Sequence, residues 1–70
     1  MAVARVTEII SSSKESWEDA ARQGLSRAAK TLRGITGLEI IRQNAKVVNG
    51  RIQEYRVELR ITFVLEDNQN

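Results

Sequence analysis

The last third of the chain alternates apolar and polar residues with a period of two. In the segment YRVELRITFVLE, every second position is apolar, namely Tyr55, Val57, Leu59, Ile61, Phe63 and Leu65. The positions between them include Arg56, Glu58, Arg60 and Thr62. This alternation is typical of a β-strand with one buried and one solvent-facing side. The strand therefore needs a covering layer, and a chain of 70 residues has little material for one.

A strand and a helix are expected before this segment. Residues Val3–Ile10 are rich in β-branched side chains and predict a first strand, which the serine cluster SSSKES should end. Ser16, followed three residues later by Asp19, resembles a capping box, and Ser13 is a second candidate for the cap. The expected helix covers residues 16–33. Its apolar stripe has spacings of three and four: Trp17, Ala20 or Ala21, Leu25, Ala28 and Leu32.

Two glycines bear on this helix. Gly24 lowers helix stability by about 1 kcal/mol relative to alanine. It indicates either that another element packs closely against the helix or that a surface glycine is tolerated there. Gly34 follows Lys30 and Arg33 at the position where a left-handed C-terminal cap is expected.

The second half of the chain predicts a long antiparallel hairpin. Residues Leu38–Val48 form a second expected strand, Asn49-Gly50 is a two-residue turn signal, and the third strand should run to about Glu66. Residues 67–70 are a polar tail. The predicted fold class is α+β with the order β-α-β-β, in which a three-stranded antiparallel sheet wraps around one helix. The whole chain, residues 1–70, is expected to be one domain.

The composition excludes several classes of chemistry. The chain has no cysteine, histidine or proline, so disulfides, the usual zinc sites, histidine-based triads and thiol nucleophiles are absent. We therefore expect a protein that is not an enzyme, in a reducing compartment. Arg5 and Glu8 interrupt the apolar residues of the N-terminal segment, so neither a signal peptide nor a membrane span is expected, and we expect a cytoplasmic protein.

Charge patterning argues against nucleic acid as a partner. Eleven basic and nine acidic residues are interleaved along the chain, and only three aromatic residues are present. A nucleic-acid groove instead has a stripe of one sign and aromatic side chains on which bases stack. We expect neither a nucleic-acid nor a membrane partner.

The small size predicts self-association. A single core in a domain of this length rarely contributes more than about 3–5 kcal/mol of stability, and such domains usually add disulfides, metals or partner subunits. Disulfides are excluded here and no metal-ligand cluster is visible in the sequence. We therefore expect an obligate homo-oligomer.

The order and pattern of these segments resemble the dodecin family. The likeness runs from Val3 to Glu66 and includes the serine-rich turn before Trp17, the helix end RAAKTLR, the NG hairpin and the closing strand TFVLE. The resemblance implies a hollow homododecamer that, in many members, binds a flavin (FMN, FAD or riboflavin). A purely structural dodecamer, or one that binds an ion or a coenzyme such as coenzyme A, is the alternative.

The resemblance also implies two pocket positions. In flavin-binding members a tryptophan at the start of the second strand stacks on the isoalloxazine ring, and a glutamine in the third strand contacts its polar edge. Gly37 and Arg56 occupy these positions here. Losing the indole costs about 3.5 kcal/mol of binding, which is roughly 300-fold in affinity. Arginine has only donors, so it cannot accept a hydrogen bond from the ring N–H. Flavin binding in the family mode is therefore predicted to be weak or lost.

Other roles for these residues are open at this point. Arg56 could pair with Glu54 or Glu58 on the exposed side of the strand, or with a carboxylate of another subunit. Gly37 could instead serve a loop that needs a positive φ, and Trp17 could be a core or interface anchor or an aromatic wall for a ligand. A metal site is not located by the sequence, since the carboxylates are scattered: Glu8, Glu15, Glu18, Asp19, Glu39, Glu54 and Glu58. One carboxylate repeated around a symmetry axis could still bind a cation.

Overall fold

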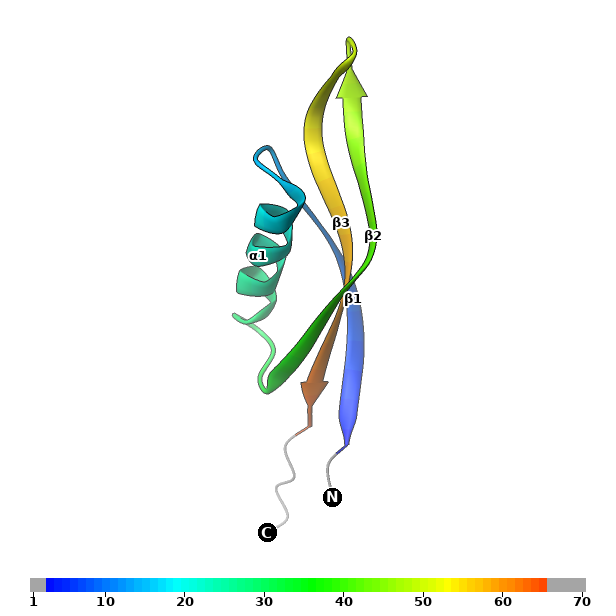
Figure 1. Ribbon diagram of the computed structural model, residues 1–70. Helices are drawn as coiled ribbons and strands as arrows, with labels where there is room; N and C mark the ends of the chain where they lie inside the picture. Colours follow the sequence, from blue (N-terminus) through cyan, green and yellow to red (C-terminus); the bar gives the residue numbers. More distant parts are fainter. Residues whose placement is uncertain (1–2, 66–70) are drawn as a thin grey trace.

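The computed structural model describes residues 3–65 and has the element order β-α-β-β (Figure 1). The elements are β1 (Ala4–Ser13), α1 (Trp17–Ala28), β2 (Ile35–Val48) and β3 (Arg51–Val64). The sheet is antiparallel with the strand order β1-β3-β2, which confirms the predicted fold class. The predicted polar tail lies outside the described residues. Within residues 3–65, no helix is long and apolar enough to cross a membrane.

The alternating strand is the centre of the sheet. Val57, Leu59 and Ile61 of β3 are fully buried, and Val57 and Leu59 form the core cluster with Ala20 of α1. We call this side of the sheet the helix face. Because side chains alternate along a strand, the even-numbered residues of β3 lie on the opposite side, which we call the open face. The alternation in the sequence is therefore confirmed as a division between core and surface.

The helix begins where the sequence predicts and ends earlier. The Ser16 hydroxyl accepts a hydrogen bond from the Asp19 N–H at 2.9 Å, which confirms Ser16 as the N-cap. The prediction that the helix reaches residue 33 is wrong, because α1 ends at Ala28. The chain beyond it tightens into short-range bonds from the Lys30 N–H to the Arg27 carbonyl and from the Thr31 N–H to the Ala28 carbonyl. This turn returns the chain to the sheet, where β2 begins three residues before the predicted Leu38.

Gly34 has the predicted left-handed conformation in a different context. Its φ is +74°, but it follows the helix end by several residues and is not the helix cap. Its carbonyl accepts a hydrogen bond from the Val64 N–H at 2.9 Å. A Cβ at this position would lie 2.7 Å from the Val64 carbonyl oxygen, so both the backbone conformation and the close approach require glycine.

The first three serines of the cluster belong to β1, which continues past the predicted Ile10 and ends within the cluster at Ser13. Ser11, Ser12 and Ser13 pair with Val57, Arg56 and Tyr55 of β3. Small side chains are needed here because the helix passes close to the strand. A Cβ on Gly24 would lie 2.8 Å from Leu59 Cδ1 and 3.0 Å from Ser11 Cβ. Of the two interpretations of Gly24, the close packing of the sheet against the helix at this position is therefore confirmed.

The hairpin is confirmed and extends well beyond the helix. Asn49 and Gly50 both have positive φ, 54° and 75°, as a two-residue hairpin turn requires. The tip of the hairpin projects past the start of α1 (Figure 1), and the molecule measures 58 × 19 × 13 Å. Its radius of gyration is 14.7 Å, whereas a compact domain of this length has about 11 Å. The protomer is thus elongated, with little of its own chain around the hairpin tip.

The close approach at Gly24 leads to a stability test. Gly24→Ala should lower the free energy of unfolding by about 1 kcal/mol, because the added methyl group displaces the fully buried Leu59 and this outweighs the gain in helix propensity. Urea unfolding followed by circular dichroism measures the change. Ser26→Ala, at an exposed position of the same helix, is the control and should change stability little. Stabilisation by Gly24→Ala would contradict the packing described here.

Candidate ligand-binding surface

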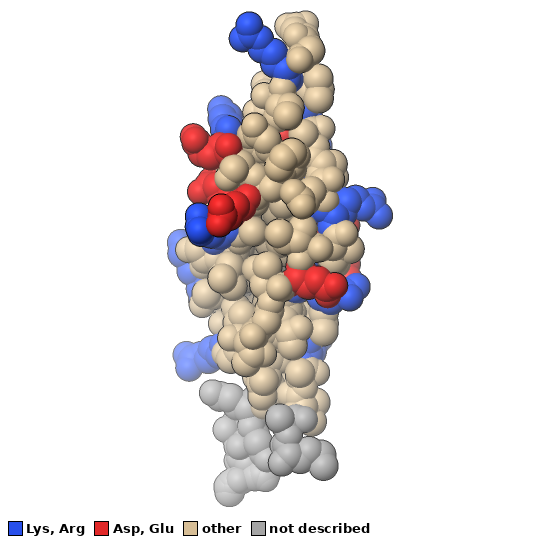
Figure 2. Space-filling model, viewed as in Figure 1, with Lys and Arg blue, Asp and Glu red and all other residues tan. Residues whose placement is uncertain are grey.

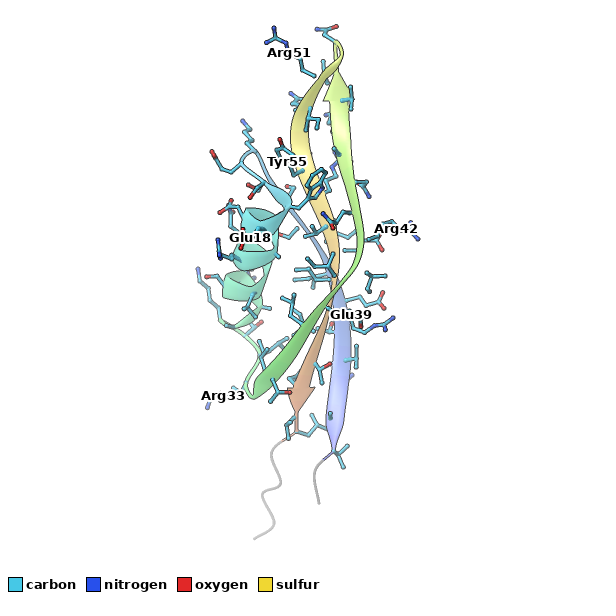
Figure 3. The ribbon with its side chains drawn as sticks, in the orientation of Figure 1. Glu18, Arg33, Glu39, Arg42, Arg51 and Tyr55 are labelled. Carbon is cyan, nitrogen blue, oxygen red and sulfur yellow. The ribbon has the colours of Figure 1, made fainter. Side chains whose placement is uncertain are left out.

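Paired charges occupy the middle of the open face. Arg60 on the central strand lies 3.2 Å from Glu8 of β1 and 3.6 Å from Glu39 of β2. The next row joins Arg42 of β2 to Glu58 of β3 at 3.7 Å. On the side of the molecule seen in Figure 2, acidic and basic side chains lie next to one another. Figure 3 shows Arg42 on the side of the sheet away from α1, whereas Tyr55 lies toward the helix.

Arg56 is engaged by a neighbour on its own strand. Its Nε and Nη2 atoms both lie 3.0 Å from Glu54 Oε1. The Arg56 side chain is 43% exposed and that of Glu54 is 30% exposed. Hydrogen bonds from Arg56, and secondly from the Ser12 hydroxyl, lower the pKa of the Glu54 carboxyl below its ordinary value. The expected pairing with Glu54 is therefore present within one protomer, while Glu58 pairs with Arg42 instead.

Gly37 lies inside β2 and not in a loop. It is opposite Thr62 of β3, next to a register irregularity at Thr36, and its φ is not positive. The interpretation that Gly37 serves a left-handed loop is therefore wrong, because β2 starts earlier than predicted and includes this residue in extended backbone. A Cβ here would lie 3.7 Å from Thr62 Cβ, an ordinary contact. Position 37 therefore has room for a larger side chain, although the residue there is glycine.

The two expected pocket residues are on the same face but far apart. Gly37 is opposite Thr62 and Arg56 is opposite Asn44, so six residues of β3 separate the two rows. At about 3.3 Å per residue this is about 20 Å along the strand. A small ring ligand cannot touch both residues of one protomer, so any pocket that contains both residues must be formed by two protomers.

Trp17 anchors the start of the helix to the hairpin. Its indole N–H donates a hydrogen bond to the Asn44 carbonyl of β2 at 2.8 Å. Its ring meets Tyr55 of β3 edge to face, with centroids 4.8 Å apart and an angle of 79°. These contacts agree with the anchor interpretation of Trp17. Sequence reasoning did not find Asn44, since a backbone carbonyl acceptor leaves no signal in residue type.

The carboxylates of the described residues form no metal centre within one protomer. In residues 3–65 no three potential metal ligands gather in one place. Glu8, Glu39, Glu54 and Glu58 each lie beside an arginine. Asp19 instead accepts hydrogen bonds from Ser13 and Gln23, which lower its pKa below the ordinary value. The negative charge of the open face is thus largely neutralised by the chain itself.

The protein has a small α+β fold of the β-α-β-β class. One helix lies on a three-stranded antiparallel sheet of order β1-β3-β2, and within residues 3–65 no other element covers the opposite side of the sheet. The chain belongs to the dodecin family, whose model, described as Dodecin, matches residues 3–66.

Named relatives agree with this assignment. Calcium dodecin of Mycobacterium tuberculosis is 32% identical over 69 residues, which are 99% of this chain and 97% of the relative. Its crystal structure, titled as a calcium-chelating antigen with a novel calcium-binding site, matches with a TM-score of 0.80 at 31% identity and covers 97% of each chain. Dodecin of Thermus thermophilus is 32% identical over 65 residues, 93% of this chain and 94% of the relative. Dodecin from Streptomyces davaonensis has a TM-score of 0.90 at 29% identity, covering 94% of this chain and 97% of that one.

The Trp17 anchor can be tested by removing only its hydrogen bond. Trp17→Phe keeps an aromatic ring against Tyr55 but loses the donor to the Asn44 carbonyl, so the free energy of unfolding should fall by about 1 kcal/mol. Trp17→Ala should cost clearly more, because the ring contact is lost as well. Tyr55→Phe keeps the ring contact and is the matched control. If Trp17→Phe and Tyr55→Phe had equal effects, the hydrogen bond would contribute nothing.

Proposed function

We propose that this chain is a non-enzymatic, self-assembling protein that holds a small ligand between protomers, in the cytoplasm, and that its family mode of flavin binding is weakened or lost. The proposal rests on the residues at the two positions where the family has its flavin contacts. Gly37 presents only backbone on the open face, and the guanidinium of Arg56 already binds Glu54. The assembly is proposed to be the dodecamer that the family resemblance implies.

The elongated protomer favours assembly. The helix lies against β1 and β3 and scarcely touches β2, so the β2 part of the helix face is poorly covered. Leu38 and Ile40 there are 37% and 42% exposed. A chain of this size has too small a core to leave such apolar surface in water without a substantial loss of stability. Contacts between copies would cover it without adding any element to the chain.

The two substitutions weaken flavin for different reasons. Without the indole at position 37, a flavin loses stacking worth about 3.5 kcal/mol. At position 56 the guanidinium offers donors to the ring carbonyls but no acceptor to the ring N–H. Arg56 would also have to leave Glu54 to reach a ligand. Both effects reduce affinity for the ring and leave the pocket suited to a ligand that does not depend on stacking.

A bound divalent ion is the second candidate. The relative from Mycobacterium tuberculosis is named calcium dodecin. Within residues 3–65 of one protomer the carboxylates do not gather into a site, so a cation would have to be bound by the same carboxylate from several copies around a symmetry axis. A structural assembly without any ligand is the remaining alternative.

The assembly is tested by the mass of the protein in solution. Sedimentation at micromolar concentration should give a single species with twelve times the mass of the chain, because the protomer exposes apolar surface that copies cover. Extraction of the purified protein followed by mass spectrometry identifies any bound small molecule. A well-folded monomer at this concentration would overturn the proposed assembly and its pockets together.

Flavin binding is tested by fluorescence titration. Riboflavin or FMN should show little quenching with the wild-type protein at submicromolar concentration. The double variant Gly37→Trp, Arg56→Gln should bind the flavin more than tenfold more tightly, since a Cβ is tolerated at position 37. Gly37→Ala is the control, because it adds a side chain without a ring. Tight binding by the wild-type protein would contradict the proposed loss of the flavin mode.

A further inference from the structure

We infer that the free edge of β1 is a contact between two copies of this chain related by twofold rotation. This inference rests on the proposed self-assembly and specifies one of its surfaces. Within residues 3–65, β1 pairs with β3 alone, so the backbone groups on its other edge have no strand partner there.

The edge of β1 is regular, whereas that of β2 is interrupted. The register of β1 with β3 runs without a shift from Ala4 to Ser13. β2 is irregular near Gly37 and near Arg42, and β-bulges of this kind twist an edge and hinder the addition of another strand. β1 has no bulge and no proline. Its charged residues are Arg5 and Glu8, and Glu8 is paired with Arg60, so few of the features that protect an exposed edge are present. β1 is therefore the edge that is suited to pairing.

Ile10 lies on this edge between two hollows. Its side chain is 73% exposed, the highest value among the exposed large apolar residues of the described chain. On one side, a groove of about 590 Å³ runs between β1 and α1, and its walls include Ile9, Ala28 and Leu32. On the other side, a hollow of about 410 Å³ is lined by Glu8, Ile9, Ile10 and Glu58. The edge thus carries a projecting apolar side chain directly beside space of a size to receive one.

This combination fits a second copy of the same chain. A twofold contact uses the same patch on both partners, so each patch must carry a projection and a matching hollow. A twofold axis perpendicular to the strands makes two β1 strands antiparallel, an orientation in which edge strands pair. Ile10 is opposite Glu58 and therefore lies on the open face, so each Ile10 would pack against the open-face hollow of the other copy. A contact with a different protein would require only a projection or only a hollow on this edge, and not both.

The charges around Ile10 are compatible with such a contact. Glu8 lies 3.2 Å from Arg60, and Glu58 lies 3.7 Å from Arg42. The carboxylates brought together by two copies are therefore already compensated, and repulsion between like charges is reduced. A strongly charged partner of either sign would find no complementary field on this patch.

The exposed area has the size that a contact of this kind needs. The protomer exposes 5342 Å², whereas a compact monomer of the same mass exposes about 4,400 Å². The excess of about 900 Å² is close to the roughly 800 Å² that each partner contributes to a standard interface. The protomer thus carries surplus surface sufficient for at least one such contact.

A charge placed on the edge tests the contact. Ile10→Lys should reduce the mass of the assembly at least twofold in sedimentation, because a lysine there opposes edge pairing. Circular dichroism should still report a folded chain, because most of the Ile10 side chain is exposed within the protomer. An assembly of wild-type size in Ile10→Lys would overturn the inference. A monomeric wild-type protein would instead overturn the proposed function, so the two failures are distinguishable.

Cross-linking gives a second measurement on the assembled protein. The chain has no cysteine, so each variant carries a single thiol. With a short bis-maleimide, Ile10→Cys should give covalent dimers and nothing larger, because a twofold edge meets one other copy. Val47→Cys is the matched control, since Val47 is 60% exposed on the hairpin of the other edge strand. Failure of Ile10→Cys to cross-link, or products larger than dimers, would overturn the twofold contact.

Discussion

The close packing of α1 on the apolar side of β3 is the interaction on which the rest of this structure depends. The helix presents Ala20, Gly24 and Ala28 to the sheet, and these small residues allow it to approach until Leu59 and Ser11 leave no space for another methyl group. Dispersion contacts and burial of apolar surface both increase with such an approach. As a consequence, the helix lies over β1 and β3 and leaves the apolar side of β2 largely uncovered.

This partial coverage links the fold to assembly. A single helix of twelve residues cannot cover two strands of fourteen residues each together with a third, so apolar side chains of β2 and of the hairpin face water in the isolated protomer. The anchor formed by Trp17, Tyr55 and the Asn44 carbonyl holds the hairpin to the helix start just below its projecting tip. The hairpin is thereby a defined projection, which is a property that a surface shared between copies requires.

The open face links the proposed ligand binding to the proposed assembly. Gly37 and Arg56 lie on that face about 20 Å apart along the strand. Arg56 and the arginines of two rows between these positions are each matched by a carboxylate. Ion pairs at this exposure contribute little to stability, but they neutralise the field that a charged ligand would otherwise meet. The character of any pocket therefore depends on which part of this face another protomer approaches.

Much of the fold was predictable because its signals are local. The Asn49-Gly50 turn, the Ser16 cap and the alternation from Tyr55 onward each depend on neighbouring residues, and all three are confirmed. The errors fall where long-range packing decides. The serines of β1 continue the strand because they pair with β3 under the helix, and the helix stops at Ala28 because the chain must return to the sheet at Ile35. Of the candidate site, the family resemblance supplied two positions, Gly37 and Arg56, and their separation followed only from the register of the strands.

The sequence by itself determined the order of elements, the core side of the central strand and the lack of histidine and thiol chemistry, because periodicity and composition act at each position independently of its distant neighbours. Only the tertiary structure decided that Gly24 is a contact and not a tolerated defect, that Gly37 lies in extended backbone, and that Arg56 binds Glu54. Each of these outcomes depends on which strand lies opposite, and that register is set by packing between segments far apart in the chain.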